Sequence, residues 1–185
     1  MKDKIIVGVD IDGTLADTME MWLSLYKEEF NVVVSEDDIV LYNMSKVFPE
    51  ITYEKMREYF EKSWERWDEI KPIPSEEEIS KINSLNKNYR IEIVTSTWGE
   101  IGNIKKWLEK YNIKYHALIF VKDSNEKPNY CDILIDDKAA NIEKMIENGK
   151  DGILLQQPWS MDKIFSRPKV KKIAKSWDEV LGYLK

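Results

Sequence analysis

Short apolar runs alternate along this chain with segments in which apolar residues recur every three or four positions. The first run, Ile5-Ile6-Val7-Gly8-Val9, is rich in β-branched residues and continuous, which is typical of a strand buried on both faces of a sheet. Strands that alternate with amphipathic helices predict an α/β fold: a Rossmann-like, mostly parallel sheet with helices on both faces. The later runs predict strands at residues 90–94, 117–121, 131–135 and 152–155.

The segment between the first strand and the later ones has a different pattern. Its apolar positions are aromatic and helically spaced, and none of its runs resembles a buried strand. We expect a helix capped by Asp17, a short helix that starts at Ser35 and covers Ile39, Val40 and Tyr42, and a longer helix from about Thr52. The segment ends at Pro72-Ile73-Pro74, which favours a stiff extended connector.

This difference predicts the domain organisation. We expect a small helical cap, inserted after strand one, that stands over the first loop of the core. The α/β core is expected at residues 1–16 and 75–185 and the cap at residues 17–74.

Composition narrows the class of protein. The chain has 185 residues with 43% hydrophobic content, enough for one real core, and a net charge of −6 that argues against nucleic acid as the main partner. The basic stretch from Lys163 to Lys175 is better explained as a solvated face than as a polynucleotide site. A small phosphorylated metabolite is compatible with this charge, while the oligomeric state stays open and a homo-oligomer is allowed.

Location and redox chemistry are also constrained. We see no signal peptide and no apolar run near the about 20 residues that cross a bilayer, so no membrane partner is expected. The single Cys131 forms no disulfide framework, and one Cys with one His makes a structural zinc site improbable. We therefore expect a cytoplasmic protein.

Polar side chains follow the ends of three predicted strands. Asp10 and Asp12 follow the first strand, Thr95 the second, and Asp136 and Asp137 the fourth. The carboxyl ends of parallel strands share one edge of a sheet, so these residues should converge where ligands bind. Four carboxylates close together repel strongly, and oxygen-only ligands call for a hard cation such as Mg²⁺.

This residue set matches the needs of phosphoryl transfer. Asp10 would attack phosphorus and form an aspartyl-phosphate, and Asp12 would protonate the leaving alcohol and later accept a proton from water. Thr95 would hydrogen-bond a phosphoryl oxygen, and Lys127 would balance negative charge. We predict the metal ligands to be Asp10, Asp12, Asp136 and Asp137, and the substrate-binding residues to be Thr95, Ser96, Trp98 and Lys127.

Several tryptophans and tyrosines have two interpretations. Rings in the helical segment could stack on a nucleobase, but we favour a role in holding the segment together. Trp98 lies beside Thr95 and either faces the substrate or covers the sheet edge, and Trp159 is equally open. The rings of the helical segment are Trp22, Tyr59, Trp64 and Trp67.

The ordered motifs resemble those of the haloacid dehalogenase (HAD) superfamily of phosphatases. Asp10-Ile11-Asp12-Gly13-Thr14, then Thr95, a lysine, and Asp136-Asp137 follow one another as in that superfamily. The resemblance covers the chain from Lys4 to about Leu155. It implies a Mg²⁺-dependent phosphatase and explains the helical segment as the superfamily's cap.

Within the superfamily the chain looks most like the 5'(3')-deoxyribonucleotidases. Leu15-Ala16-Asp17, Asp132 to Asp137, and Ser176 to Val180 support this. Lys127 lies about one residue nearer to Asp136 than in that subgroup, so Lys122 is a second candidate for the lysine. The resemblance implies a nucleoside monophosphate as substrate. The alternatives are a sugar phosphate, a nucleic-acid 3'-phosphate end, or a non-catalytic module that binds metal or phosphate.

Overall fold

The computed structural model describes residues 4–39, 44–160 and 169–184. Across these residues the chain forms a six-stranded sheet with the order β3-β2-β1-β4-β5-β6, in which every neighbouring pair is parallel. This confirms the predicted α/β, Rossmann-like fold. The strands are β1 (Ile6–Val9), β2 (Arg90–Thr95), β3 (Ala117–Phe120), β4 (Ile133–Asp136), β5 (Asp151–Leu155) and β6 (Ile173–Ala174).

The sixth strand is the one that the sequence pattern did not predict. It has two residues and lies within the stretch that we interpreted as a basic solvated face. Ala174 is buried and pairs with Leu155 of β5, so the sheet edge, and not local hydrophobicity, makes this segment a strand. Residues 161–168 of that stretch lie outside the described residues.

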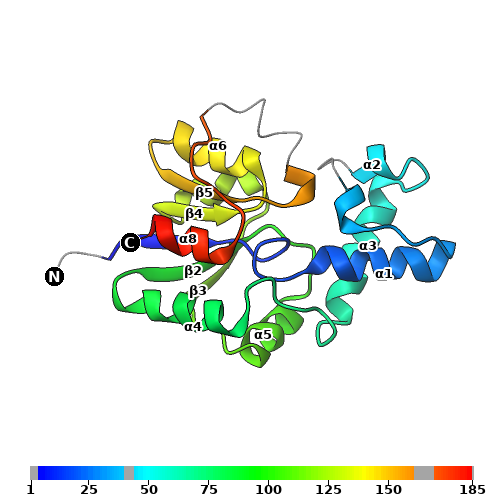
Figure 1. Ribbon diagram of the computed structural model, residues 1–185, viewed down its shortest axis with the longest axis horizontal. Helices are drawn as coiled ribbons and strands as arrows, with labels where there is room; N and C mark the ends of the chain where they lie inside the picture. Colours follow the sequence, from blue (N-terminus) through cyan, green and yellow to red (C-terminus); the bar gives the residue numbers. More distant parts are fainter. Residues whose placement is uncertain (1–3, 40–43, 161–168, 185) are drawn as a thin grey trace.

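Helices cover both faces of the sheet (Figure 1). On one face α4 (Glu76–Ser84), α5 (Ile101–Lys110) and α8 (Trp177–Tyr183) pack in the cluster that contains Val7 and Val9. On the other face α6 (Ala139–Glu147) packs against Leu134 and Leu154. Residues at the helix ends define where these helices begin and end. Ser75 and Glu78 form a capping box for α4, and Asn112 adopts a positive φ just after α5.

The segment between β1 and α4 is helical, and its helices α1 (Thr18–Phe30), α2 (Met44–Val47) and α3 (Tyr53–Glu65) extend beyond one end of the sheet (Figure 1). Asp17 caps α1 and Thr52 caps α3, as expected. The helix predicted from Ser35 is only a 3-10 turn, Glu36–Asp38, because Ile39 already leaves helical geometry. Val40 and Tyr42, which were expected in it, lie outside the described residues.

Two aromatic side chains of this segment act as internal packing residues. Trp22 and Tyr59 are buried in a cluster with Tyr26 and Phe48, which confirms the packing interpretation for these two rings. The division into a core and a cap at residues 17–74 stays a prediction. None of the described helices combines the length and the apolar character that a bilayer crossing requires.

Candidate active site

The site begins in the tight loop that follows β1. The amides of Thr14, Leu15 and Ala16 all donate to the carbonyl of Ile11, which folds the chain back on itself. Gly13 has a φ of +70°, and a Cβ there would lie 2.7 Å from Oδ2 of Asp137. Glycine is therefore required both for the turn and for the close approach of the loop after β4.

Three carboxylates meet beside this loop. Asp10, Asp136 and Asp137 are buried, and each offers an oxygen within 4.8 Å of the others. Strand pairing explains why Asp10 and Asp136 lie close together. β1 and β4 are direct neighbours, and the amide of Asp10 donates to the carbonyl of Ile135 at 2.9 Å. The convergence expected from the strand ends is thus present for these residues.

Lys127 is buried inside this group. Its Nζ lies 2.9 Å from Oδ1 of Asp10 and 2.6 Å from Oδ2 of Asp136, and its side chain is 1% exposed. It is carried by the 3-10 helix η3 (Ser124–Asn129), which the sequence pattern did not reveal. Lys122, the alternative lysine, is exposed.

Asp136 is held from several sides. Oδ2 accepts from Lys127 and from Nδ2 of Asn141 at 2.9 Å, and Oδ1 accepts from the amide of Lys138 at 2.8 Å. Asp137 is fixed separately. Nε1 of Trp159 donates to its Oδ2 at 2.5 Å. These bonds leave the two adjacent carboxylates in defined and different orientations.

Asp12 lies in the same loop, but its carboxylate has a different environment. Nε1 of Trp64, on α3, donates to its Oδ1 at 2.9 Å, and the hydroxyls of Thr97 and Thr18 also hydrogen-bond the carboxylate. It lies outside the three-carboxylate group. Neutral donors therefore hold Asp12, whereas a lysine holds Asp10 and Asp136.

Burial shifts the protonation equilibria of the site. Burial raises the pKa of Asp10 to about 7, Lys127 opposes this rise, and Asp136 adds to it. Burial also raises the pKa of Asp137 well above its usual range, with Asp136 and Asp10 contributing. Although burial by itself would lower it, the pKa of Lys127 is raised by Asp10 and Asp136. These raised pKa values show that three ionised carboxylates would carry more negative charge than one lysine compensates.

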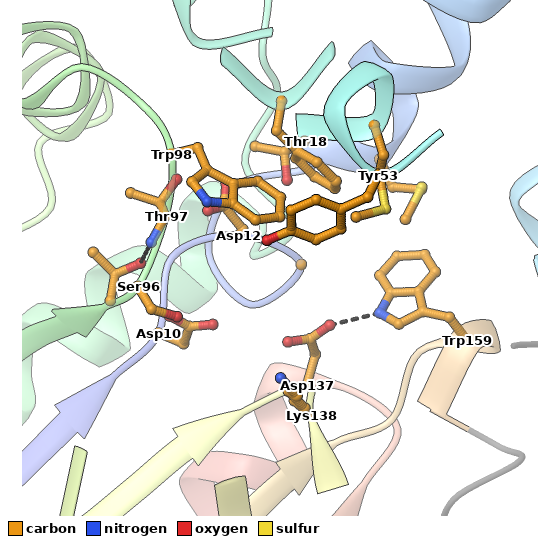
Figure 2. A pocket seen from close by; sticks show the side chains of 15 residues that line it. Asp10, Asp12, Thr18, Tyr53, Ser96, Thr97, Trp98, Asp137, Lys138 and Trp159 are labelled. Carbon is orange, nitrogen blue, oxygen red and sulfur yellow. Dashed lines mark hydrogen bonds between the residues drawn. The ribbon is translucent and has the colours of Figure 1, made fainter. Parts of the chain in front are cut away.

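A pocket of about 500 Å³ opens directly onto these residues (Figure 2). Asp10, Asp12 and Asp137 line one side. Apolar and aromatic side chains from α1, α3 and the loop after β2 line the opposite side, where Figure 2 shows Tyr53 and Trp98 next to each other. Trp159 lies beside Asp137. The apolar lining consists of Met19, Tyr53, Met56, Phe60, Trp98 and Trp159.

The structure brings most predicted site residues to this pocket. Thr95, Ser96 and Trp98 line it, and the hydroxyl of Thr95 accepts from the amide of Thr97 at 3.2 Å. Trp98 packs against Tyr53 and Phe60, so it faces the pocket while contacting α3. Lys127 does not line the pocket and contacts it through Asp10.

Sequence reasoning missed the pocket residues of the helical segment. Thr18, Met19, Tyr53, Met56 and Phe60 carry no motif, and helical spacing alone does not say which face of α1 or α3 meets the pocket. It also missed the bonds of Trp64 to Asp12 and of Trp159 to Asp137. Their buried indoles gave no local signal of a polar partner.

The donor set fits a divalent cation. Asp10, Asp136 and Asp137 supply only carboxylate oxygens, which hard cations such as Mg²⁺ prefer. The excess negative charge around Lys127 favours the same conclusion. The sequence also predicts Asp12 as a ligand, but its carboxylate lies outside this group, so we leave it out of the set.

A parallel sheet of this order, with aspartates in the loop after β1 and a carboxylate pair at the end of β4, is the arrangement of a HAD-type phosphatase, a phosphoric monoester hydrolase. Comparison with known families gives the particular group. Residues 4–184 match the family described as "5' nucleotidase, deoxy (Pyrimidine), cytosolic type C protein", and the chain belongs to this family.

Curated relatives agree with this assignment. A putative 5'(3')-deoxyribonucleotidase of Chlorobaculum tepidum is 23% identical over 158 residues, which cover 80% of this chain and 77% of the relative. A 5'(3')-deoxyribonucleotidase of Bacillus subtilis is 23% identical over 143 residues, covering 76% of this chain and 80% of the relative.

Solved structures confirm the fold. A haloacid dehalogenase-like hydrolase from Streptococcus pneumoniae has a TM-score of 0.68 at 14% identity, with all of both chains covered. A HAD-type hydrolase from Bacillus subtilis, solved with bound magnesium, has a TM-score of 0.60 at 15% identity and also covers both chains completely.

Proposed function

We propose that this protein is a Mg²⁺-dependent phosphatase of nucleoside monophosphates that acts through an aspartyl-phosphate on Asp10. The observation that supports the proposal best is the group of Asp10, Asp136 and Asp137, with Lys127 paired to the first two and a pocket at its edge. The family and its curated relatives supply the nucleotide as the first substrate to test.

In the proposed first half-reaction, a carboxylate oxygen of Asp10 attacks the phosphorus of the monoester. The bond between phosphorus and the ester oxygen breaks, and the leaving oxygen takes the proton of Asp12. Lys127 holds Asp10 in place through Oδ1 and balances part of the negative charge. Thr95 is positioned at the pocket to hydrogen-bond a phosphoryl oxygen.

In the second half-reaction, a water oxygen attacks the phosphorus of the phosphorylated Asp10. Asp12 accepts a proton from this water, the bond between phosphorus and Asp10 breaks, and inorganic phosphate leaves. Asp12 returns to its protonated form, which readies it for the next substrate. One residue thus serves as acid and then as base, which the placement of Asp12 at the pocket, apart from the three-carboxylate group, permits.

Asp10, Asp136 and Asp137 are the proposed ligands of the metal. When bound there, Mg²⁺ would supply positive charge to the phosphoryl oxygens as they gain negative charge. Monoester hydrolysis without a catalyst is among the slowest reactions known, so charge stabilisation must be a large part of catalysis.

The aromatic side of the pocket supports a substrate with a flat apolar group. Trp98, Tyr53 and Phe60 form a contact cluster there, and stacking of a base on such rings is worth about 1–3 kcal/mol. A small phosphorylated metabolite in the cytoplasm remains our proposal for substrate class and location.

The test is a panel of monophosphates assayed with Mg²⁺ and with EDTA. We expect deoxynucleoside and nucleoside monophosphates, with 5' and 3' positions tested separately, to exceed sugar phosphates and oligonucleotides with a 3'-phosphate. EDTA should remove the activity and Mg²⁺ should restore it. Nucleotides that are no better than sugar phosphates would exclude the nucleotidase proposal, and no turnover of any ester would favour a binding module.

A further inference from the structure

The indole N–H groups of the buried tryptophans divide into two classes. Five of the seven tryptophans are buried, and each donates a hydrogen bond. Three donate to main-chain carbonyls, as expected for packing residues. The other two donate to carboxylates of the candidate site. The first class consists of Trp22 to Met56, Trp107 to Ile70 and Trp177 to Thr14, and the second of Trp64 to Asp12 and Trp159 to Asp137.

Trp64 is held rigidly. It is 0% exposed and packs edge-on against Trp107 with ring centroids 6.1 Å apart. The loop after β2 closes over it at Gly99, where an added Cβ would lie 2.3 Å from Cδ1 of Trp64. Although Trp64 belongs to α3, it is buried in the cluster of the sheet that includes Ile11 and Leu15. Its N–H is therefore presented to Asp12 in one fixed direction.

The chemistry of its donor distinguishes Trp64 from the other partners of Asp12. An indole N–H can donate but cannot accept, whereas the hydroxyls of Thr18 and Thr97 can do both. Of these three partners, Trp64 alone must donate, so it fixes Oδ1 of Asp12 as an acceptor. Because its N–H occupies Oδ1, the transferable proton is best carried by Oδ2.

We propose that Trp64 is a positioning residue for the acid–base step: its indole N–H keeps Oδ1 of Asp12 as a hydrogen-bond acceptor, so that Oδ2 carries the proton given to the leaving group. The inference rests on the proposed function, in which Asp12 is the acid. It adds that a helix of the segment between β1 and α4 completes the proton donor.

The test compares two substrates whose leaving groups differ in their need for a proton. Trp64→Phe keeps a large buried ring and removes only the N–H. With a nucleoside monophosphate, whose leaving alkoxide needs a proton, we expect kcat/KM to fall by roughly tenfold or more, part of the 10²–10⁴ that general acids supply. With p-nitrophenyl phosphate, whose leaving group needs no proton, the fall should stay below about threefold. kcat/KM is chosen because it reports only the steps through transfer to Asp10.

Trp107→Phe is the matched control. Trp107 is also 0% exposed, lies in the same cluster, and donates to the carbonyl of Ile70 at 2.9 Å. It should lose stability much as Trp64→Phe does, measured by thermal unfolding, but without changing the ratio of the two kcat/KM values. Gly99→Ala displaces the same indole from the other side and should reproduce the selective loss seen for Trp64→Phe.

Equal losses on the two esters in Trp64→Phe would show a packing role only and would overturn the inference, as would a selective loss in Trp107→Phe. Assays of the native protein and of Asp12→Asn distinguish a failure of this inference from a failure of the proposed function. If Asp12→Asn retains full kcat/KM on the nucleotide, or native protein hydrolyses neither ester, the proposed function itself is wrong.

Discussion

Among the described residues, the carboxylate groups around Asp10 and around Glu36 both have raised pKa values, and they differ in what surrounds them. At the carboxyl ends of β1 and β4, Asp10 and Asp136 share the buried Lys127. At the start of α1, Glu36 lies near Asp17 and Glu20, and its Oε1 is buried with no hydrogen-bond partner among the described residues. The first cluster is organised by the sheet, and the second forms where the turn Glu36–Asp38 packs on α1.

The comparison shows why charge alone does not define a site. Both clusters raise carboxyl pKa values through burial, Asp10 to about 7 and Glu36 to about 8. The second cluster also borders a pocket, and Lys71 lies 2.6 Å from Glu20 there, but this lysine is exposed. Among the described residues, only the first combines a buried lysine with three buried carboxylates at the edge of a pocket. Buried and preorganised charge at a cavity can do chemistry, whereas we expect the second cluster, whose lysine is exposed, to affect stability only.

The largest effect is expected at the nucleophile. Asp10→Asn should lower turnover of a nucleoside monophosphate by roughly 10⁴-fold or more, because an amide cannot form the phosphoryl intermediate. Circular dichroism and thermal unfolding should show an intact fold. Glu36→Gln in the second cluster is the control and should retain turnover. Substantial activity in Asp10→Asn would assign the nucleophile to another residue.

The second effect concerns the cation that distinguishes the two clusters. Lys127→Met should cost about 3–5 kcal/mol of unfolding free energy, since it leaves Asp10 and Asp136 buried without their partner. Denaturant unfolding measures this change. Lys122→Met removes an exposed lysine and should change stability by less than about 0.5 kcal/mol. Similar losses in both variants would contradict the assignment of the motif lysine to Lys127.

A smaller effect is expected at the other indole that bonds a site carboxylate. Trp159→Phe removes the hydrogen-bond donor to Oδ2 of Asp137. Loss of a residue that hydrogen-bonds a metal ligand typically lowers the metal affinity by about 10–100-fold. We expect the Mg²⁺ concentration for half-maximal activity to rise about tenfold. Trp64→Phe should leave it unchanged, because Asp12 lies outside the ligand group. The same rise in both variants would refute this separation of roles.

The smallest effect belongs to the second cluster and depends on pH. Burial, then Asp17, raise the pKa of Glu36 from 4.5 to about 8. Between these values the folded state binds more protons than the unfolded state, so the free energy of unfolding falls as pH rises through this window. Glu36→Gln removes this titration. Its melting temperature should match that of native protein near pH 4 and exceed it by a few degrees at pH 8.

Glu65→Gln provides the control for that measurement, since Glu65 is exposed on α3. Its melting temperature should follow that of native protein at every pH. A Glu36→Gln variant that is no more stable than native protein at pH 8 would show that the second cluster carries no electrostatic cost.

The amino-acid sequence by itself determined the strands β1 to β5, the polar residues at their ends and the order of the motifs, but not β6. Continuous β-branched runs are typical of strands that are buried between helices on both faces of a sheet. The carboxyl ends of parallel strands share one edge, which brings Asp10, Asp136 and Asp137 together. Capping signals at Asp17, Thr52 and Ser75 are equally local, and all three helices begin where those residues stand.

Only the tertiary structure decided which lysine enters the carboxylate group, which rings reach the pocket and which indoles hold carboxylates. Lys127 and Lys122 are alike in sequence, and the turn of η3 buries one of them. Trp64 lies 52 residues from Asp12, and Trp159 lies 22 residues from Asp137. Such contacts depend on how α3 and the loop after β5 pack on the sheet, and no local pattern of hydrophobicity encodes a long-range hydrogen bond.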